Sequence, residues 1–197
     1  MNSISNYAYA KTNFLICICL TIAMILYASI IMGSQSKCIT VELPEEVSLL
    51  GLRIGYSYES AIALLEILSP EALKCYSKLL RVWDSIFPFL YGSMYIAWLS
   101  LILKKIKLKN DKLYMVNLFP FIPLLADLVE NYFENALISE FILLQTLNKT
   151  SLLIASNITR IKWSFSILNY ILIISGIVLL LSKIWKKRNE NNSITFT

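Results

Sequence analysis

The chain has 197 residues, of which 57% are hydrophobic and only 16% charged, a balance outside the usual range of soluble domains. Its formal charge is +5, but the basic residues lie at the ends of apolar segments, which argues against a nucleic-acid-binding face. The chain contains no histidine, which excludes Ser-His and Cys-His catalytic sets and most zinc sites. No metal or cofactor is expected.

Four apolar segments are each long enough to cross a lipid bilayer, for which about 20 residues suffice. They cover residues 14–32, 84–103, 113–136 and 161–182. The first also has features of a signal peptide, but its apolar core is longer than the roughly 7–15 residues usual for one. We therefore predict an all-α fold, a multi-pass transmembrane four-helix bundle that forms a single membrane domain over residues 1–197.

Lysine and arginine predict how this bundle is oriented, because they concentrate on the cytoplasmic side of membrane proteins. Five lysines lie in the short link at 104–112, and four basic residues follow the last apolar segment at 183–188. Both clusters fall on one side of the bundle. We expect an integral membrane protein with both termini cytoplasmic, in a bacterial inner (plasma) membrane.

On the opposite, outer side, residues 33–81 carry signals for two short helices. Apolar residues recur at helical spacing after Ser57, and Ser69-Pro70-Glu71 combines a capping serine with a proline at the first helical position. These patterns predict amphipathic helices over about 57–82. We expect them to lie along the membrane surface as a lid over the bundle, and the second to run on directly into the second apolar segment.

Four cysteines are present, two in the first apolar segment and two, Cys38 and Cys75, in the outer part. They do not form a C-x-x-C pair. Unpaired cysteines are the expectation. A disulfide between Cys38 and Cys75 is the alternative in an oxidising compartment.

The second apolar segment opens with a carboxylate and a proline at helical spacing, Asp84 and Pro88. Proline lacks an amide hydrogen and crowds the carbonyl four residues back, here that of Asp84. One interpretation is a kink beside a buried carboxylate. The other is that Pro88 only starts a regular helix while Asp84 lies among lipid headgroups.

The third segment concentrates polar residues on one face. Asp127, Glu130, Asn131 and Glu134 fall within roughly 100° of one another on a helix. Carboxylates in hydrocarbon are costly, so they tend to be paired or to face water. Basic residues at the start of the fourth segment enter at the same level and are their expected partners. The predicted cluster, a candidate ligand-binding site, comprises Asp84, Tyr91, Asp127, Glu130, Asn131, Thr159, Arg160, Lys162 and Trp163.

Three interpretations of this cluster stay open. It is a structural clasp that fixes the register of the helices, which is the leading hypothesis. Alternatively, it belongs to a small membrane enzyme or binding protein, in which Asp84 and Asp127 act on an amphipathic or lipid-like ligand. In the third interpretation the protein is an accessory subunit that supplies helices to a larger membrane complex.

Three motifs together resemble those of a family of small bacterial integral membrane proteins with four predicted spans. The motifs are Asp84-x-x-Phe87-Pro88-x-x-Tyr91-Gly92, Asp127-x-x-Glu130-Asn131 and Ala155-Ser156-x-x-Thr159-x-x-Lys162-Trp163. The resemblance covers about residues 51–163. It implies the architecture and the choice of site residues, and it implies no reaction.

Overall fold

The computed structural model describes residues 3–106 and 111–194, and within these ranges every regular element is helical. The α-helices are α1 (Ser3–Lys11), α2 (Phe14–Leu26), α3 (Gly33–Thr40), α4 (Tyr58–Ile67), α5 (Pro70–Lys78), α6 (Phe87–Ile106), α7 (Phe121–Leu144) and α8 (Lys149–Ile194). Three helical runs are long and apolar enough to cross a membrane, namely Phe14–Thr40, Pro70–Ile106 and Lys149–Lys186. The prediction of an all-α membrane protein is confirmed to this extent.

The first membrane-crossing helix is longer than its apolar segment. Asn13 caps α2 by accepting a hydrogen bond from the amide of Ile16 at 3.0 Å. A π-helical stretch, Tyr27–Met32, then joins α2 to α3 without a break. The predicted boundary at residue 32 marks the end of the apolar run only. The helix continues to Thr40 through residues too polar to give a hydrophobic signal.

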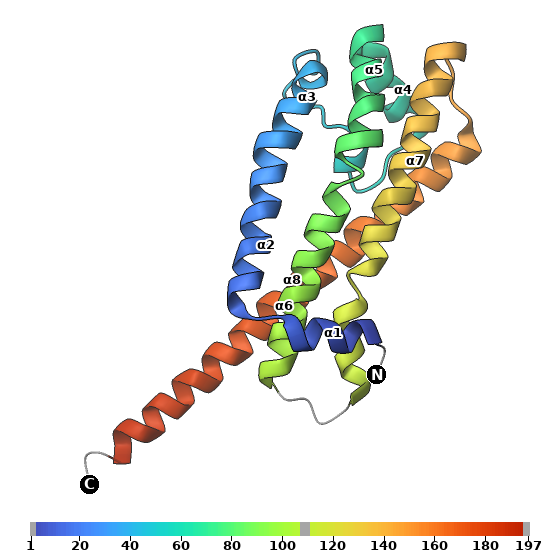
Figure 1. The fold of residues 1–197 in the computed structure, drawn as a ribbon. Coiled ribbons are helices and arrows are strands. Elements are labelled where there is room, and N and C mark those ends of the chain that lie inside the picture. The colour runs from blue at the N-terminus through green and yellow to red at the C-terminus, as the bar shows by residue number, and fades with distance from the viewer. Residues whose placement is uncertain (1–2, 107–110, 195–197) are drawn as a thin grey trace.

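The two outer helices begin where their capping residues predict. The side chain of Ser57 accepts a hydrogen bond from the amide of Ser60 at the start of α4, and Ser69 does the same for Ala72 in α5. Helix α5 continues towards α6 within one helical run, Pro70–Ile106, as its sequence predicts, but it is not the membrane-lying lid that was also expected. In Figure 1, α5 stands nearly in line with α6 and extends the bundle, so it does not lie across the bundle's end.

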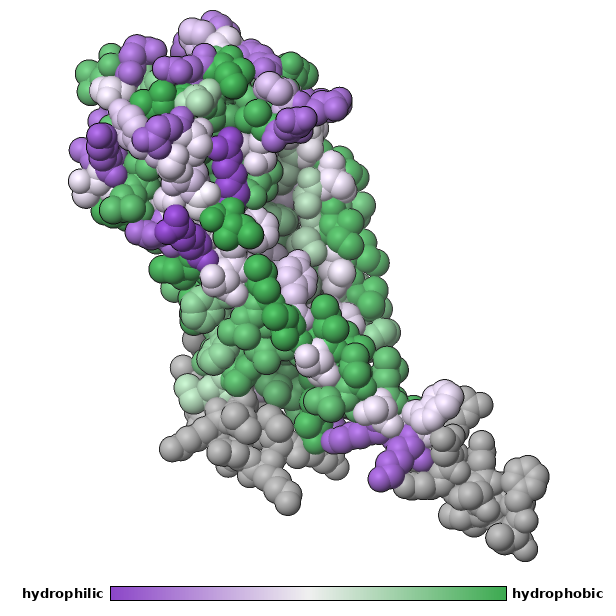
Figure 2. All heavy atoms as spheres, turned by 180° about the vertical axis from the view of Figure 1, so that it is seen from behind, coloured by the Kyte–Doolittle hydropathy of each residue, from purple (hydrophilic) through white to green (hydrophobic). Residues whose placement is uncertain are grey.

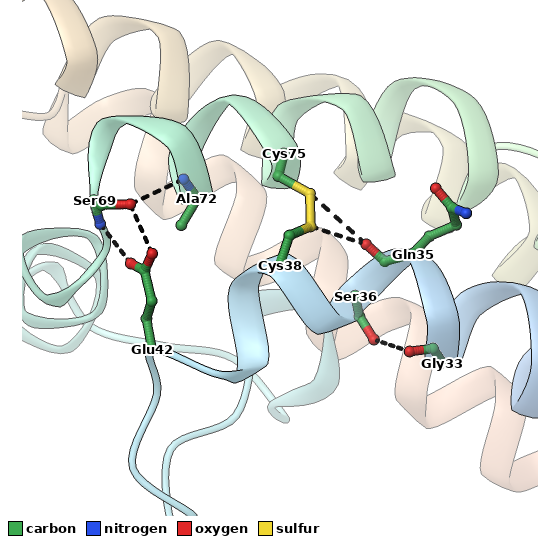
Figure 3. The surroundings of a disulfide bond; sticks show 8 residues. All are labelled: Gly33, Gln35, Ser36, Cys38, Glu42, Ser69, Ala72 and Cys75. Carbon is green, nitrogen blue, oxygen red and sulfur yellow. Dashed lines mark hydrogen bonds between the residues drawn. A yellow bond between two sulfur atoms is a disulfide. The ribbon is translucent and has the colours of Figure 1, made fainter.

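A disulfide ties the upper end of the first membrane-crossing helix to α5. It joins Cys38 and Cys75, whose Cα atoms are 6.5 Å apart (Figure 3). The expectation of unpaired cysteines was therefore wrong for this pair, because the helical extension α3 brings Cys38 beside α5. Nearby, the carboxylate of Glu42 accepts hydrogen bonds from the amide and hydroxyl of Ser69, both at 2.7 Å. Two links therefore hold α5 against the end of α3.

The chain bends beside Asp84. A π-helical stretch, Leu79–Trp83, ends in a turn, and α6 begins at Phe87 with Pro88 as its second residue. The amide of Asp84 bonds to the carbonyl of Leu79 at 2.9 Å, and the regular helical pattern stops there. Each interpretation of Pro88 is therefore right in part. This proline lies at the start of α6, as in the second interpretation, and the helix is interrupted beside the Asp84 carboxylate, as in the first.

Helix α7 begins and ends later than predicted. The third predicted segment covers 113–136, but residues Asp111–Leu118 form a 3₁₀ helix and α7 starts only at Phe121, after Pro120. Proline favours the start of a helix because its missing amide hydrogen is not needed there. At the other end α7 continues to Leu144, where Gln145 takes up a left-handed conformation with φ of 53°.

Helix α8 is a single helix of 46 residues, longer than the predicted segment at 161–182. Its first part packs along α7, and it crosses α6 where Gly176 lies against Ile102, so closely that a Cβ at Gly176 would be 2.4 Å from Cγ2 of Ile102. Beyond this crossing α8 leaves the bundle, and its far end extends away from the other helices (Figure 1). Apolar side chains on this part are exposed, namely Val178, Leu179, Leu181, Ile184 and Trp185.

The buried core and the polar surface are both concentrated at one end of the molecule, the end that carries α4 and α5. The largest group of buried apolar side chains packs α4 and α5 against the upper ends of α7 and α8, and it includes Leu65, Tyr76 and Phe141. On the face drawn in Figure 2, polar side chains gather at the end that carries α4 and α5, and apolar side chains dominate the long middle part. This distribution is typical of a protein whose middle faces lipid.

Candidate functional site

A buried lysine on α8 joins two carboxylates of α7. The Nζ of Lys162 lies 3.2 Å from Oδ1 of Asp127 and 2.5 Å from Oε2 of Glu130. Glu130 is fully buried, and its other oxygen, Oε1, accepts a 2.6 Å hydrogen bond from the hydroxyl of Thr159. Burial makes such charge pairs sensitive to the loss of one partner, since the remaining charge would be left without compensation.

A third buried carboxylate on α7, Glu134, is held by two tyrosines instead of a cation. Tyr56 donates to Oε1 and Tyr76 donates to Oε2, each at 3.2 Å. Burial and the nearby Glu134 carboxylate raise the pKa of Tyr56 well above its ordinary value, so this hydroxyl stays a neutral donor. Below, the polar cluster means Asp127, Glu130, Glu134, Thr159 and Lys162.

A loop between α3 and α4 covers this cluster. The backbone carbonyl of Gly51 accepts hydrogen bonds from Nζ of Lys162 at 2.9 Å and from Nε1 of Trp163 at 3.2 Å. The amide of Leu50 donates to the hydroxyl of Tyr76 at 3.0 Å. The loop is therefore fastened to α8 and α5 through its own backbone.

Asp84 lies beside the polar cluster but is not one of the ion pairs of the described residues. Asn131 of α7 is close enough to influence the Asp84 carboxylate, and its buried amide nitrogen makes no hydrogen bond within the described residues. Asp84 is only half-buried, and it lines two cavities. Asp127 lines only the smaller chamber and Glu134 only the larger one, so Asp84 is the carboxylate that a ligand spanning both chambers would meet where they adjoin.

The two cavities adjoin at Asp84. The smaller chamber, of about 210 Å³, is walled mainly by polar and aromatic side chains, which include Asp127, Lys162, Tyr91 and Trp163. The larger chamber, of about 460 Å³, lies between the first membrane-crossing helix, the loop and the end of α5, and its lining is mostly apolar. Four residues line both chambers: Gly51, Leu52, Asp84 and Phe87.

Aromatic rings form a continuous wall along α6. Phe87 contacts Tyr91 with ring centroids 5.4 Å apart, and Tyr91 contacts Tyr95 at 5.6 Å. The hydroxyl of Tyr91 donates to Oδ2 of Asp127 at 3.0 Å, so this wall is also tied to the polar cluster. The side chain of Leu124 of α7 packs onto Gly92 of α6, where a Cβ would be 2.7 Å from Cδ1 of Leu124.

The structure brings most of the predicted site residues together. Around the cluster and the smaller chamber lie Asp84, Tyr91, Asp127, Glu130, Asn131, Thr159, Lys162 and Trp163. Arg160 is the exception. It is exposed, donates to Asn157 at 3.4 Å, and lies over Gly55, where a Cβ would be 2.6 Å from Nε of Arg160. Residues two positions apart on a helix point in directions that differ by about 200°, so Arg160 and Lys162 cannot share one face.

Other members of the site gave no clear signal in the sequence. Tyr56 and Tyr76 are donors to Glu134 that only the folded outer segment brings into place. The backbone of Gly51 contributes an acceptor that any residue could provide. Within the described residues, no group of three or more metal-ligating side chains is found.

Comparison of the chain with protein-family models, with curated proteins and with solved structures yields no match. The fold and the site therefore define only a class of protein, namely a helical membrane protein with a buried polar cluster and two adjoining chambers.

Proposed function

We propose that this protein binds an amphipathic ligand within the membrane, in the two chambers that adjoin at Asp84. The observation that carries the proposal is the pairing of a mostly apolar chamber of about 460 Å³ with a polar, aromatic one of about 210 Å³. Small-molecule sites commonly have about 300–1,000 Å³ and combine apolar walls with a few polar groups. The larger chamber alone falls in this range.

The polar cluster has a different role in this proposal, that of a clasp for the walls of the site. Lys162 links α8 to α7 and to the loop that roofs both chambers. Because its ammonium already has three acceptors, it has no donor left for a ligand. In this proposal the polar cluster holds the helices together, and the adjoining chambers bind the ligand.

The proposed setting is a bacterial inner membrane, with α7 as a fourth membrane-crossing helix and both termini cytoplasmic. Helix α7 has 24 residues, about 36 Å, which is enough to cross the hydrocarbon core. Its acids point inward, while Leu125, Val129 and Tyr132 are exposed on its other side. The resemblance to small bacterial four-span proteins and the basic residues at 104–112 and 183–188 support this arrangement.

The experiment is to fill the larger chamber. Ala28 lines it, whereas Ala23, on the same membrane-crossing helix, is exposed on the outside. We expect Ala28→Trp to abolish the co-purification of a small amphiphile, detected by mass spectrometry after gentle extraction, and Ala23→Trp to leave it unchanged. An identical set of bound molecules in both variants would rule out the chamber as the site.

A further inference from the structure

The ligand site contains more acidic groups than basic ones. In the described residues, Lys162 is the buried cation near three buried carboxylates, Asp127, Glu130 and Glu134. Its ammonium is already bound by Asp127, Glu130 and the carbonyl of Gly51. Asp84 adds a fourth carboxylate at the junction of the chambers. An anionic ligand would meet this excess of acidic groups, and the unpartnered donor beside Asp84, the amide of Asn131, is neutral and does not offset it.

We infer that the polar end of the ligand is a cation, a protonated amine, which the carboxylate of Asp84 binds where the two chambers adjoin. This inference rests on the proposed function and names the chemical class of the ligand. An ammonium group would donate hydrogen bonds to the carboxylate and offset its charge. An alcohol could satisfy the hydrogen bond but would leave the charge without compensation.

The surroundings of Asp84 suit such a group. Phe87 and Tyr91 line the smaller chamber together with Asp84, and aromatic faces attract cations. The ring of Trp163 already has Nζ of Lys162 5.7 Å from its centroid. Asn131 lies next to Asp84 and contributes a neutral amide, which adds no opposing charge. The polar end of the ligand therefore lies in the smaller chamber.

The apolar part of the ligand then occupies the larger chamber. Its walls include Met32, Leu43, Val47 and Leu79. An apolar cavity of about 150 Å³ is enough to hold benzene, and this chamber measures about 460 Å³. The space accommodates a branched or chain-like hydrocarbon portion, so the inferred ligand is a cationic amphiphile.

The test compares three probes of equal chain length, dodecylamine, dodecanol and dodecanoate, added to the full chain in lipid nanodiscs. Binding is measured from the dependence of the unfolding temperature on probe concentration. We expect dodecylamine to bind most tightly. In Asp84→Asn its affinity falls roughly 10- to 150-fold, the range for hydrogen bonds to charged groups, while that of dodecanol stays nearly unchanged. Glu66→Gln, which removes an exposed carboxylate of α4, is the matched control.

The outcomes separate the inference from the proposed function. If all three probes bind equally well and Ala28→Trp abolishes their binding, the chambers bind amphiphiles but the inference of a cationic end is wrong. If Ala28→Trp changes nothing for any probe, the proposed function fails and the inference fails with it. Asp84 takes part in no ion pair of the described residues, so Asp84→Asn should fold, which gel filtration checks.

Discussion

Replacing Lys162 by methionine tests whether the polar cluster holds the helices together. The change removes the contacts of Nζ with Asp127 at 3.2 Å, with Glu130 at 2.5 Å and with the carbonyl of Gly51 at 2.9 Å. Two buried carboxylates then lose their common cation. Removing one partner of a buried ion pair costs about 3–5 kcal/mol of unfolding free energy. For a chain of this size that lowers the unfolding temperature by roughly 6–20 °C.

The structure also defines which further changes should restore stability. Because Lys162 binds both acids, Lys162→Met with Asp127→Asn alone still leaves Glu130 buried without a cation. The triple variant with Glu130→Gln as well removes all three charges of the ion pairs and leaves Glu134 with its two tyrosine donors. Neutral replacements of buried charges are often tolerated, so we expect the triple variant to recover most of the lost stability. The amide oxygen of the new glutamine can still accept the hydrogen bond from Thr159.

The measurement is the thermal unfolding of the purified protein in a mild detergent, followed by intrinsic fluorescence and by the loss of the monodisperse peak in gel filtration. Arg160→Met is the matched control, because Arg160 lies two residues from Lys162 but is exposed. Surface changes of this kind stay within about 0.5 kcal/mol. Equal unfolding temperatures for Lys162→Met and Arg160→Met would refute the clasp.

Three further predictions concern the outer end and the helix crossing. Cys38→Ser should lower the unfolding free energy by about 4 kcal/mol, the loop-closure value for a sequence separation of 37 residues, as measured by denaturant titration. Glu42 accepts two hydrogen bonds from the start of α5, which lower its pKa below the ordinary 4.5. Its contribution should therefore be complete above about pH 4.5 and lost at lower pH, so the difference in unfolding temperature between wild type and Glu42→Gln should shrink there. Gly176→Ala should destabilise by about 1–3 kcal/mol, because its Cβ would lie 2.4 Å from a side chain of α6.

The cysteine and glycine predictions have control variants within the chain, and the Glu42 prediction has a result that would contradict it. Cys19→Ser removes an exposed free thiol and should leave the unfolding free energy unchanged. A difference between wild type and Glu42→Gln that stays constant between pH 6 and pH 3 would contradict the proposed hydrogen-bonded carboxylate. Gly33→Ala should be neutral or stabilising, because the nearest atom to its Cβ would be 3.9 Å away in a helix where alanine is favoured. Similar losses for both glycine variants would show that steric crowding at the α6–α8 crossing is not the cause.

The sequence predicted what depends on local pattern. Hydrophobic length located the three helical runs that are long and apolar enough to cross a membrane, and capping residues such as Ser57 and Ser69 located the starts of α4 and α5. Helical spacing placed Asp127 and Glu130 on one face, and in the structure both form ion pairs with Lys162. The same spacing rule would have separated Arg160 from Lys162 if applied within α8.

What the sequence did not predict depends on contacts between distant segments. The disulfide requires that α3 continue beyond the apolar run, and polar residues give no hydrophobic signal for such an extension. The donors to Glu134 come from Tyr56 and Tyr76, which lie 78 and 58 residues away in the chain. The chambers are spaces between helices, and their shape follows from packing that a single sequence does not encode in any short pattern.

The loop between α3 and α4 is held by hydrogen bonds to the backbone oxygen of Gly51, and this has a consequence for mutagenesis experiments. Lys162 and Trp163 bind the peptide oxygen of Gly51, an atom that every amino acid carries. A scan of substitutions along the loop keeps this oxygen, and at Gly51 itself it adds a Cβ 3.4 Å from Oε1 of Glu130 and 3.5 Å from Nζ of Lys162, so the scan does not measure the anchor. Replacing the peptide group that follows Gly51 by an ester makes this oxygen a poorer acceptor. The same change removes the amide of Leu52, which donates to the carbonyl of Leu49 at 3.1 Å, so the two losses are measured together.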